Sequence, residues 1–337
     1  MHLEIYAPEY KGDLKGLIQI CHGMTEYMGR YVEFAKYFTS RGYIVFGNDI
    51  ISHGHSTTPR SSCLYINDWN DTVKDMVSAR EYVVRKYPNL PIYLLGFSLG
   101  SFIVRTNADL TPYKKEILIG TGAQSAFLMR IMRTWIGKKY TGKMSCASDK
   151  IYDLMFGTYG KKFKGRPANY WLLTDNEKRR EYADDSLVRQ DVSPAFFCEF
   201  SKGMECASRN LKNPNNTIPT LFLYGKKDPV SGFGKGVRKV YKAYKENNPD
   251  TEIRSFPGTH DILHDSGYES VFKAIADYLR KQYYNQNPML YPEKLLQSCR
   301  AVQSPFVLLF ILRMYNKRSN ICLQALHKCN DAGYLIT

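Results

Sequence analysis

The sequence lacks closely spaced cysteine pairs. Its eight cysteines lie at positions 21, 63, 146, 198, 206, 299, 322 and 329, and none of them forms a C-x-x-C pair. Zinc knuckles and thioredoxin-type redox sites depend on such pairs, so neither is expected. Free thiols in a reducing compartment fit this pattern. We expect no metal and no organic cofactor.

Targeting and membrane signals are also lacking. The N-terminus, MHLEIYAPEY, has neither a basic segment nor an apolar core, so it does not resemble a secretory signal. The longest apolar run near the C-terminus, residues 306–312, is far shorter than the roughly 20 residues of a membrane-spanning helix. These absences predict a soluble, cytoplasmic protein.

Acidic residues are scarce relative to basic ones. Lys and Arg together number 47 against 32 Asp and Glu, and residues 130–180 hold 13 basic residues but only four acidic ones. No zinc-finger spacing or RRM-type aromatic motif accompanies this charge, so nucleic acid is not expected as a partner. A solvated basic face is the favoured interpretation, and attraction of an anionic lipid or substrate is the alternative.

What is present is an alternation of short apolar segments with longer helical patterns. Residues 31–42, 71–88 and 268–284 place apolar side chains at helical intervals. Strands are predicted at residues 17–20, 43–46, 92–95, 117–119, 220–224 and 252–256. This order predicts an α/β fold with a mostly parallel central sheet flanked by helices.

The alternation stops between about residues 124 and 214, where no clear strand is visible. We therefore expect a helical cap inserted over the active edge of the sheet, since a structureless loop of this length is uncommon. The predicted organisation is a core of residues 1–123, a cap of residues 124–214, the rest of the core at residues 215–284, and an extension at residues 285–337. The extension combines apolar and basic residues, but no role is assigned to it.

A reactive serine is predicted in PIYLLGFSLGSFIVR, residues 91–105. Ser98 lies between Gly96 and Gly100, where a predicted strand ends and a helix begins. The pattern G-x-S-x-G in this context is typical of a nucleophile turn, because glycine removes collisions with the adjacent backbone. An ordinary glycine-rich turn is the alternative. The helix that follows also directs N–H groups toward a developing oxyanion.

A serine nucleophile needs a base, and the expected chain order is Ser, Asp, His. Of the seven histidines, His260 is favoured because it directly follows the strand predicted at 252–256. His264 lies one helical turn later, where we expect it to face solvent or cap the turn. His22 precedes Ser98 and is more readily explained as a structural histidine.

The remaining catalytic groups are predicted at other strand ends. Asp228 follows the strand at 220–224 and can orient the imidazole of His260. Taken alone, its Asp-Pro sequence would indicate only a turn. An oxyanion hole requires two N–H donors, for which we predict the backbone amides of Leu99, next to the nucleophile, and Met24, in the loop after residues 17–20.

Five segments resemble the monoacylglycerol lipase and lysophospholipase group of α/β-hydrolases, also described as serine aminopeptidase-like hydrolases. They are ICHGMTEYMGRYVEFAKYFTSRGYIVFGND, LLGFSLGSF, YADDSL, IPTLFLYGKKDPV and HDILHD. The resemblance covers about residues 1–284. It implies a capped α/β-hydrolase in which Ser98, Asp228 and His260 match the triad and Met24 and Leu99 match the oxyanion amides. The segment DIISHGHS departs from the family, and the N-terminus is shorter by one strand.

The residues and the resemblance together predict a serine hydrolase of monoacylglycerol-like or lysophospholipid-like esters that acts through an acyl-enzyme. Its substrate-binding residues and oligomeric state are left open, and we also consider transient contact with a membrane surface. One alternative is an aminopeptidase of the same fold, and another is a non-catalytic binding protein. An apolar stripe in the predicted cap would line an acyl tunnel or belong to the core. It comprises Phe127, Met129, Ile131, Met132, Trp135 and Ile136.

Overall fold

Seven strands form one sheet in the computed structural model, in the order β1-β3-β2-β4-β5-β6-β7. The structure describes residues 1–9, 12–57, 63–107, 110, 112–211 and 218–281. These residues belong to one compact unit that ends at Lys281. The extension predicted at 285–337 lies outside the described residues.

The strands agree with the predicted positions, with one addition. Five of them, β2 to β6, have almost entirely buried, mainly apolar residues, as expected of parallel strands with both faces covered. The strands are β1 (Leu3–Tyr6), β2 (Gly16–Cys21), β3 (Tyr43–Asn48), β4 (Ile92–Phe97), β5 (Tyr113–Ile119), β6 (Thr220–Gly225) and β7 (Glu252–Phe256).

Strand β1 was not predicted from the sequence. It pairs antiparallel with β3 at the edge of the sheet, where Leu3 lies opposite Asn48 and Tyr6 opposite Val45. All four of its residues are half-buried, so the apolar alternation that identifies a strand is weak. The other neighbouring pairs are parallel.

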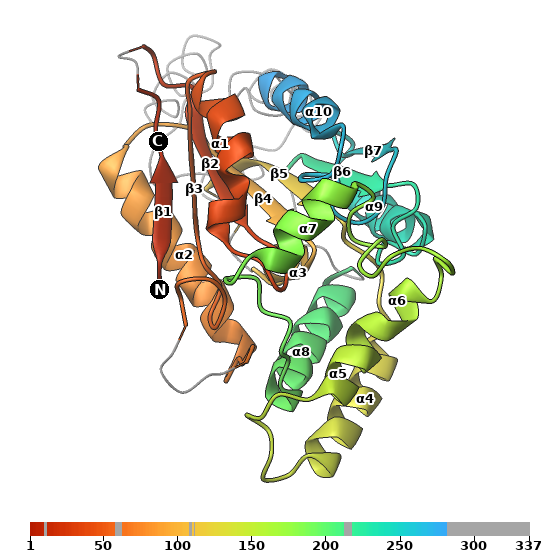
Figure 1. Cartoon of the computed structure of the whole chain (residues 1–337). Coiled ribbons are helices and arrows are strands. Elements are labelled where there is room, and N and C mark those ends of the chain that lie inside the picture. The colour runs from red at the N-terminus through yellow and green to blue at the C-terminus, as the bar shows by residue number, and fades with distance from the viewer. Residues whose placement is uncertain (10–11, 58–62, 108–109, 111, 212–217, 282–337) are drawn as a thin grey trace, which may run out of the picture. The chain divides into compact units, whose positions relative to one another are not determined.

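Helices cover both faces of the sheet (Figure 1). Helix α1 (Val32–Thr39), preceded by the short helix η1 (Met28–Tyr31), lies beside α10 (Tyr268–Arg280), and Phe34 and Phe38 pack against Phe272. Right-handed crossovers place α2 (Trp69–Lys86), α3 (Leu99–Thr106) and α9 (Lys235–Asn247) on the other face.

The segment between β5 and β6 is helical, and no strand occurs among its described residues. We call residues 124–211 the insertion. Its longer helices begin after Ser or Asp side chains that accept backbone N–H groups, as at Ser125, Asp175 and Ser193. The helices are α4 (Ala126–Lys139), α5 (Asp149–Tyr152), η2 (Asp153–Gly157), α6 (Thr158–Gly160), α7 (Asn176–Asp184) and α8 (Pro194–Asn210).

The two glycines around Ser98 are required by close packing. A Cβ atom at Gly100 would lie 1.9 Å from the carbonyl oxygen of Cys21 in β2, and one at Gly96 would lie 2.9 Å from the Gly100 oxygen. The absence of side chains therefore lets α3 start directly above the neighbouring strand. Within the described part of the chain, no helix has the length and apolar character needed to cross a membrane.

We predict that Gly100→Ala destabilises the protein, by at least about 1–3 kcal/mol of unfolding free energy, because the added methyl group meets backbone. Gly137→Ala in α4 is the matched control, since a Cβ there has nothing within 4 Å. The control variant should be more stable than wild type by roughly 0.5–1 kcal/mol. Urea denaturation measures both changes, and equal stabilities for the two variants would contradict the packing argument.

Candidate active site

The predicted site residues meet at the carboxyl edge of the sheet. Chain connections leave β2 and β4, which are neighbours, toward opposite faces, which creates the crevice where α/β proteins place ligands. Ser98 follows β4 and Met24 lies in the loop after β2. Asp228 and His260 follow β6 and β7.

Ser98 has a backbone conformation that few non-glycine residues adopt. Its φ is 48° and its ψ is −113°, between the last residue of β4 and the first residue of α3. Such a conformation costs of order 1–3 kcal/mol, so the surrounding structure must hold it. The Ser98 N–H donates to the Ile119 carbonyl at 2.9 Å, which ties this turn to β5.

Ser98, His260 and Asp228 form a continuous hydrogen-bonded chain. The Ser98 Oγ lies 2.8 Å from His260 Nε2, and His260 Nδ1 lies 3.0 Å from Asp228 Oδ1. His260 is 2% exposed and Asp228 is fully buried. With the ring proton on Nδ1, His260 donates to Asp228 and accepts the Ser98 hydroxyl, which is the arrangement that activates a serine.

The pKa of His260 reflects two opposed effects. Burial disfavours the charged ring and lowers the pKa, whereas the charge of Asp228 and the hydrogen bond to it raise the pKa. Asp261 and Glu26 add further negative charge, and the pKa ends above its ordinary value. The imidazolium that forms when His260 takes a proton is therefore stabilised.

Asp228 is both a turn residue and a hydrogen-bond partner of His260, the two roles considered from the sequence. Its N–H donates to the Gly225 carbonyl at 3.0 Å, which closes the turn after β6. Its Oδ1 accepts the Val230 N–H at 2.8 Å as well as the His260 ring. The Asp-Pro turn therefore orients the carboxylate toward the histidine.

The two amides predicted for an oxyanion hole lie on adjacent strand ends. Leu99 begins α3, so its N–H has no partner within the helix. Met24 follows Gly23, whose N–H donates to Glu26 Oε1 at 2.6 Å. His22 supports this loop from below: its Nδ1 donates to the Gly23 carbonyl and its Nε2 accepts the Ile50 N–H at 2.9 Å.

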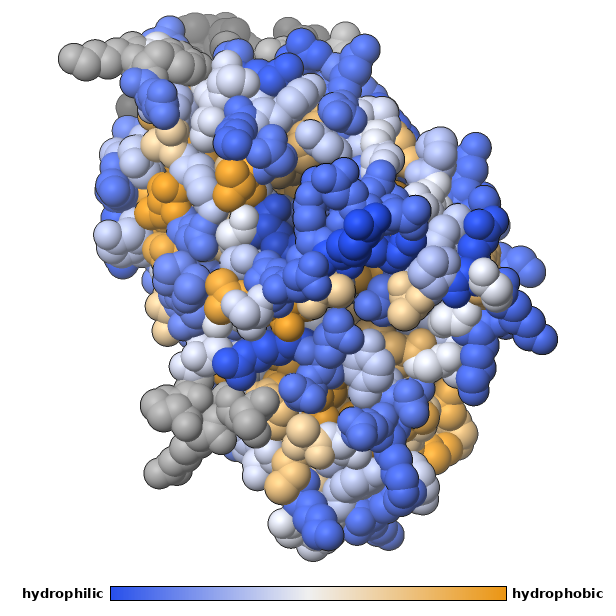
Figure 2. Space-filling view, viewed as in Figure 1, coloured by the Kyte–Doolittle hydropathy of each residue, from blue (hydrophilic) through white to orange (hydrophobic). Residues whose placement is uncertain are grey.

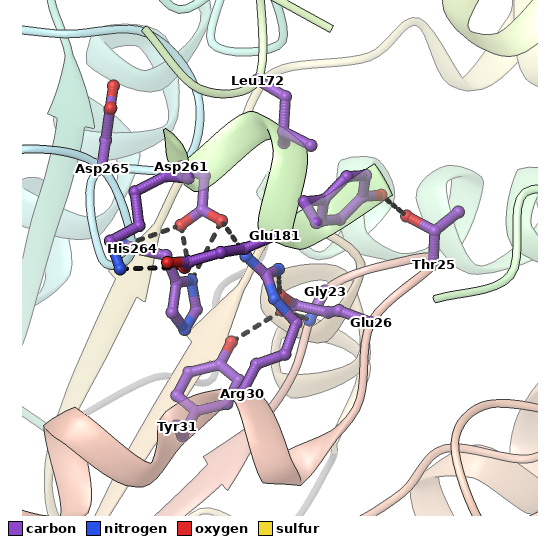
Figure 3. Close-up of polar contacts among 12 residues, drawn as sticks. Gly23, Thr25, Glu26, Arg30, Tyr31, Leu172, Glu181, Asp261, His264 and Asp265 are labelled. Carbon is purple, nitrogen blue, oxygen red and sulfur yellow. Dashed lines mark hydrogen bonds and ion pairs between the residues drawn. The ribbon is translucent and has the colours of Figure 1, made fainter. Parts of the chain in front are cut away.

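A buried ionic network connects the loop after β2 with the histidine loop (Figure 3). Arg30 contacts Glu26 at 2.5 Å and Asp261 at 3.3 Å, and Asp261 contacts His264 Nδ1 at 2.8 Å. Burial opposes ionisation of Asp261, but the charges of His264 and Arg30 lower its pKa to about 2. Glu26 also accepts the hydroxyl of Tyr31 at 2.8 Å. His264 is thus part of this network and does not face solvent.

The same network contains the side chains best placed to bind a cation. Glu26, Asp261 and His264 offer ligand atoms within 4.8 Å of one another. The guanidinium of Arg30 already contacts both carboxylates and supplies the positive charge. We therefore assign no metal to the cluster.

A cavity of about 160 Å³ opens beside Ser98 and His260. Its wall includes five methionines, Met24, Met129, Met132, Met155 and Met204. Aromatic rings supply much of the remaining lining, namely Phe97, Phe102, Tyr152, Phe156, Tyr159, Trp171, Tyr182, Phe197 and Phe200. The lining also includes the charged side chains of Glu26 and Arg30, but the cavity is largely apolar.

The apolar stripe predicted in the insertion is divided between two faces of α4. Met129 and Met132 line the cavity, and Ile136 is 1% exposed. By contrast, Phe127, Ile131 and Trp135 are 74%, 48% and 53% exposed. The interpretation of the stripe as one tunnel or one core is therefore wrong, because half of it faces outward.

Comparison with known proteins agrees with the resemblance seen in the sequence. Residues 12–267 match the serine aminopeptidase S33 family. The chain belongs to this family. It is 35% identical over 260 residues to the monoglyceride lipase of Mus musculus, covering 75% of this chain and 77% of the relative. It is 27% identical over 271 residues to a monoglyceride lipase homolog of Monkeypox virus, covering 79% and 89%.

Solved structures with low sequence identity have the same fold. A carboxyl esterase from Bacillus coagulans aligns with a TM-score of 0.73 at 21% identity, over 82% of this chain and 94% of its own. A soluble variant of the Saccharomyces cerevisiae monoglyceride lipase aligns with a TM-score of 0.63 at 15% identity, over 82% and 90%. The predicted α/β-hydrolase fold is confirmed.

Several residues of the site were not found from the sequence. Glu26 and Arg30 lie within the first of the five segments that resemble the family, but their pairing with Asp261 was not inferred. Trp171 was also missed, although its ring lies 5.8 Å from that of His260. Its segment has no periodic pattern, so the sequence carries no signal for this contact.

The buried histidines beneath the site predict acid sensitivity. Burial lowers the pKa of His22, and burial together with the His22 charge lowers the pKa of His53 to about 3. An unfolded histidine titrates near 6.5, so the unfolded chain binds more protons below that pH. The stability that neutral His53 contributes is complete above about pH 6.5 and is lost as pH falls toward 3.

We predict that His53→Asn weakens the pH dependence of stability, since Asn does not titrate and can still donate to the Ile51 carbonyl. When the pH is lowered from 7 to 4.5, the unfolding free energy of wild type should fall by about 2–3 kcal/mol relative to that of the variant. Urea denaturation at several pH values measures both free energies. A difference that stays constant across this range would show that His53 is not neutral in the folded state.

Proposed function

We propose that the chain is a carboxylic ester hydrolase that acts on monoacylglycerol-like or lysophospholipid-like substrates. The observation that carries the proposal is the hydrogen-bonded chain from Ser98 through His260 to Asp228, at the wall of a largely apolar cavity. Relatives described as monoglyceride lipases, in mouse and in a poxvirus, support an ester substrate with an acyl chain.

In the proposed reaction, the Ser98 Oγ attacks the acyl carbonyl carbon while His260 Nε2 takes the hydroxyl proton. The amides of Met24 and Leu99 hold the oxyanion, and Asp228 stabilises the imidazolium. The tetrahedral intermediate then releases the alcohol, which receives the proton from His260. Water attacks the acyl-enzyme, with His260 again as base, and releases the fatty acid.

The cavity lining offers side chains suited to both parts of such a substrate. Methionine and aromatic side chains favour an acyl chain, which needs no hydrogen-bond partners. Glu26, Arg30 and Tyr182 also line the cavity and can hydrogen-bond an alcohol or glycerol group.

An aminopeptidase activity is less well supported by the cavity. Binding a substrate ammonium group requires an available carboxylate, and Glu26 is the only acidic side chain among the described lining residues. Glu26 is already paired with Arg30 at 2.5 Å. A non-catalytic binding role is opposed by the hydrogen-bonded triad.

We predict that Ser98→Ala lowers kcat/KM for monoacylglycerol and p-nitrophenyl esters by about 10⁴-fold or more, and abolishes fluorophosphonate labelling. Ser270→Ala on α10 serves as the control and should match wild type. Aminoacyl-naphthylamides should be poor substrates. Ester hydrolysis that persists unchanged in Ser98→Ala would rule out the mechanism, and preferential naphthylamide cleavage would favour the peptidase.

The pH profile provides a separate check. His260 must be neutral to act as base, and its pKa lies above the ordinary value of about 6.5. We expect kcat/KM to rise with pH through a single ionisation above 6.5 and to be low at pH 5. A profile that is flat from pH 5 to pH 8 would contradict the assignment of His260 as the base.

We further propose that the insertion acts as a cap that can contact an anionic lipid surface. Phe127, Leu128, Ile131 and Trp135 form an exposed apolar face of α4, and Figure 2 shows hydrophobic residues among hydrophilic ones in this part of the molecule. Exposed basic residues border it at the end of α4, where Lys138 and Lys139 lie in the last turn and the Lys139 Nζ lies 4.3 Å from the centre of the Trp135 ring. The same insertion also contains the exposed Lys143, Lys161, Lys162 and Lys164. An apolar face with a basic border is typical of interfacial helices.

We predict that the double variant Ile131→Asp with Trp135→Asp loses at least about fivefold in affinity for phosphatidylserine-containing vesicles, because it removes apolar area and adds negative charge. Tyr82→Asp on α2 is the control, since Tyr82 is 51% exposed outside the insertion. Vesicle sedimentation measures binding. Equal affinity of the double variant and wild type would exclude this face of α4 as the contact.

A further inference from the structure

The loop that carries His260 is held by the insertion as well as by the core. The His260 N–H donates to the Trp171 carbonyl at 3.2 Å and the Asp261 N–H donates to the Leu172 carbonyl at 2.9 Å. The Thr259 hydroxyl also donates to the Leu172 carbonyl, at 3.1 Å. Residues 171–175, which we call the strap, therefore run along the catalytic histidine itself.

One buried carboxylate connects the strap to this loop at its other end. Asp265 is 3% exposed. Its Oδ2 accepts the Thr174 N–H at 2.8 Å and the Thr174 hydroxyl at 2.6 Å. Its Oδ1 accepts the Asp175 N–H at 2.9 Å and the Ser266 N–H at 3.0 Å. Figure 3 shows Asp265 and Leu172 at the margin of the network around Asp261.

The core secures this loop at a different point. The Lys227 N–H donates to the Gly258 carbonyl at 3.0 Å, which ties the beginning of the loop to the turn that carries Asp228. Beyond Gly258, the amides of His260 and Asp261 have the strap carbonyls as their partners. The backbone position of His260 thus depends on the strap, and the strap depends on Asp265.

We propose that Asp265 is a positioning residue for His260: it fixes the strap, and the strap sets the distance of the imidazole from Ser98 and Asp228. The inference deepens the proposed function, because it concerns the same histidine. It also implies that the insertion stays attached to the His260 loop at the strap.

Displacement of a catalytic group by about 1 Å can lower a rate by about 100-fold. We therefore expect Asp265→Ala to lower kcat by 10- to 100-fold while KM changes less than about threefold, since Asp265 does not line the cavity. The matched control is Asp68→Ala, which also removes a carboxylate that accepts a backbone N–H, at the start of α2. Its kcat should remain within about twofold of wild type.

A second variant tests the same contact with a smaller change. Thr174→Val removes one hydroxyl donor to Asp265 and should lower kcat by several-fold, whereas Thr174→Ser keeps that donor and should restore wild-type kcat. Loss of stability alone would lower the active fraction without separating Val from Ser in this way. Fluorophosphonate titration of active Ser98 corrects kcat for any unfolded protein.

Two further readouts distinguish positioning from stability. A loosened His260 has weaker contact with Asp228, so the acid limb of the kcat/KM profile should move to lower pH in Asp265→Ala. The carboxylates of Asp228, Asp261 and Glu26 raise the pKa of His260, and neither Asp265→Ala nor Asp68→Ala removes any of them. The low-field proton resonance of His260 Nδ1–H should also broaden or disappear in Asp265→Ala and persist in Asp68→Ala.

The resonance separates this inference from the proposed function, because it reports the His260 contact with Asp228 whether or not the protein hydrolyses esters. Inactive wild-type protein would overturn the proposed function and leave the resonance comparison decisive. A resonance, kcat and pH profile in Asp265→Ala that match those of Asp68→Ala would overturn the positioning role.

Discussion

The close approach of α3 to β2 is the constraint on which the rest of the site depends. Gly100 lies so near the Cys21 carbonyl that a methyl group would overlap it. This approach allows the chain to turn within one residue, at Ser98, whose positive φ points the hydroxyl out of the sheet edge. The N–H of Leu99 then lies at the start of a helix beside the loop of Met24. The predicted nucleophile, Ser98, and one of the two predicted oxyanion donors, the Leu99 N–H, are thus positioned by the same turn.

The buried charged side chains near the site are stabilised by ion pairs with one another. Arg30 lies between Glu26 and Asp261 and is itself 11% exposed in its side chain, so three ionised groups share a poorly hydrated region. Unpaired, each would cost several kcal/mol, but the contacts and the hydrogen bonds from Gly23 and Tyr31 satisfy them. The network also joins the loop after β2 to the loop after β7. The loops that carry the predicted site residues Met24 and His260 are therefore connected to each other.

The sequence predicted those features of the fold and the site that depend on a local pattern of residues. Ser98, Asp228 and His260 were predicted as site residues because each follows a recognisable strand, and parallel strands bring their carboxyl ends to one edge, where the three side chains meet. Strand β1 was missed because it is only four residues long, which is too short for a repeated alternation of apolar and polar residues. The division of the α4 stripe was missed because both faces of that helix are apolar, and only packing against α8 decides which one is buried. The contacts of the strap could not be predicted from the sequence. They are made by the backbone carbonyls of Trp171 and Leu172, and every residue type has such a carbonyl.

The five methionines of the cavity wall give the site a further property. Methionine has no branch near the backbone and turns freely about three side-chain bonds, and its sulfur is polarisable. A wall built from such side chains takes its final contour from the molecule that enters it, in contrast to the rigid hydrogen-bonded frame around Ser98. Under the proposed function, bent and straight hydrocarbon tails would both fit against this pliable surface, while the ester would be held in a single geometry.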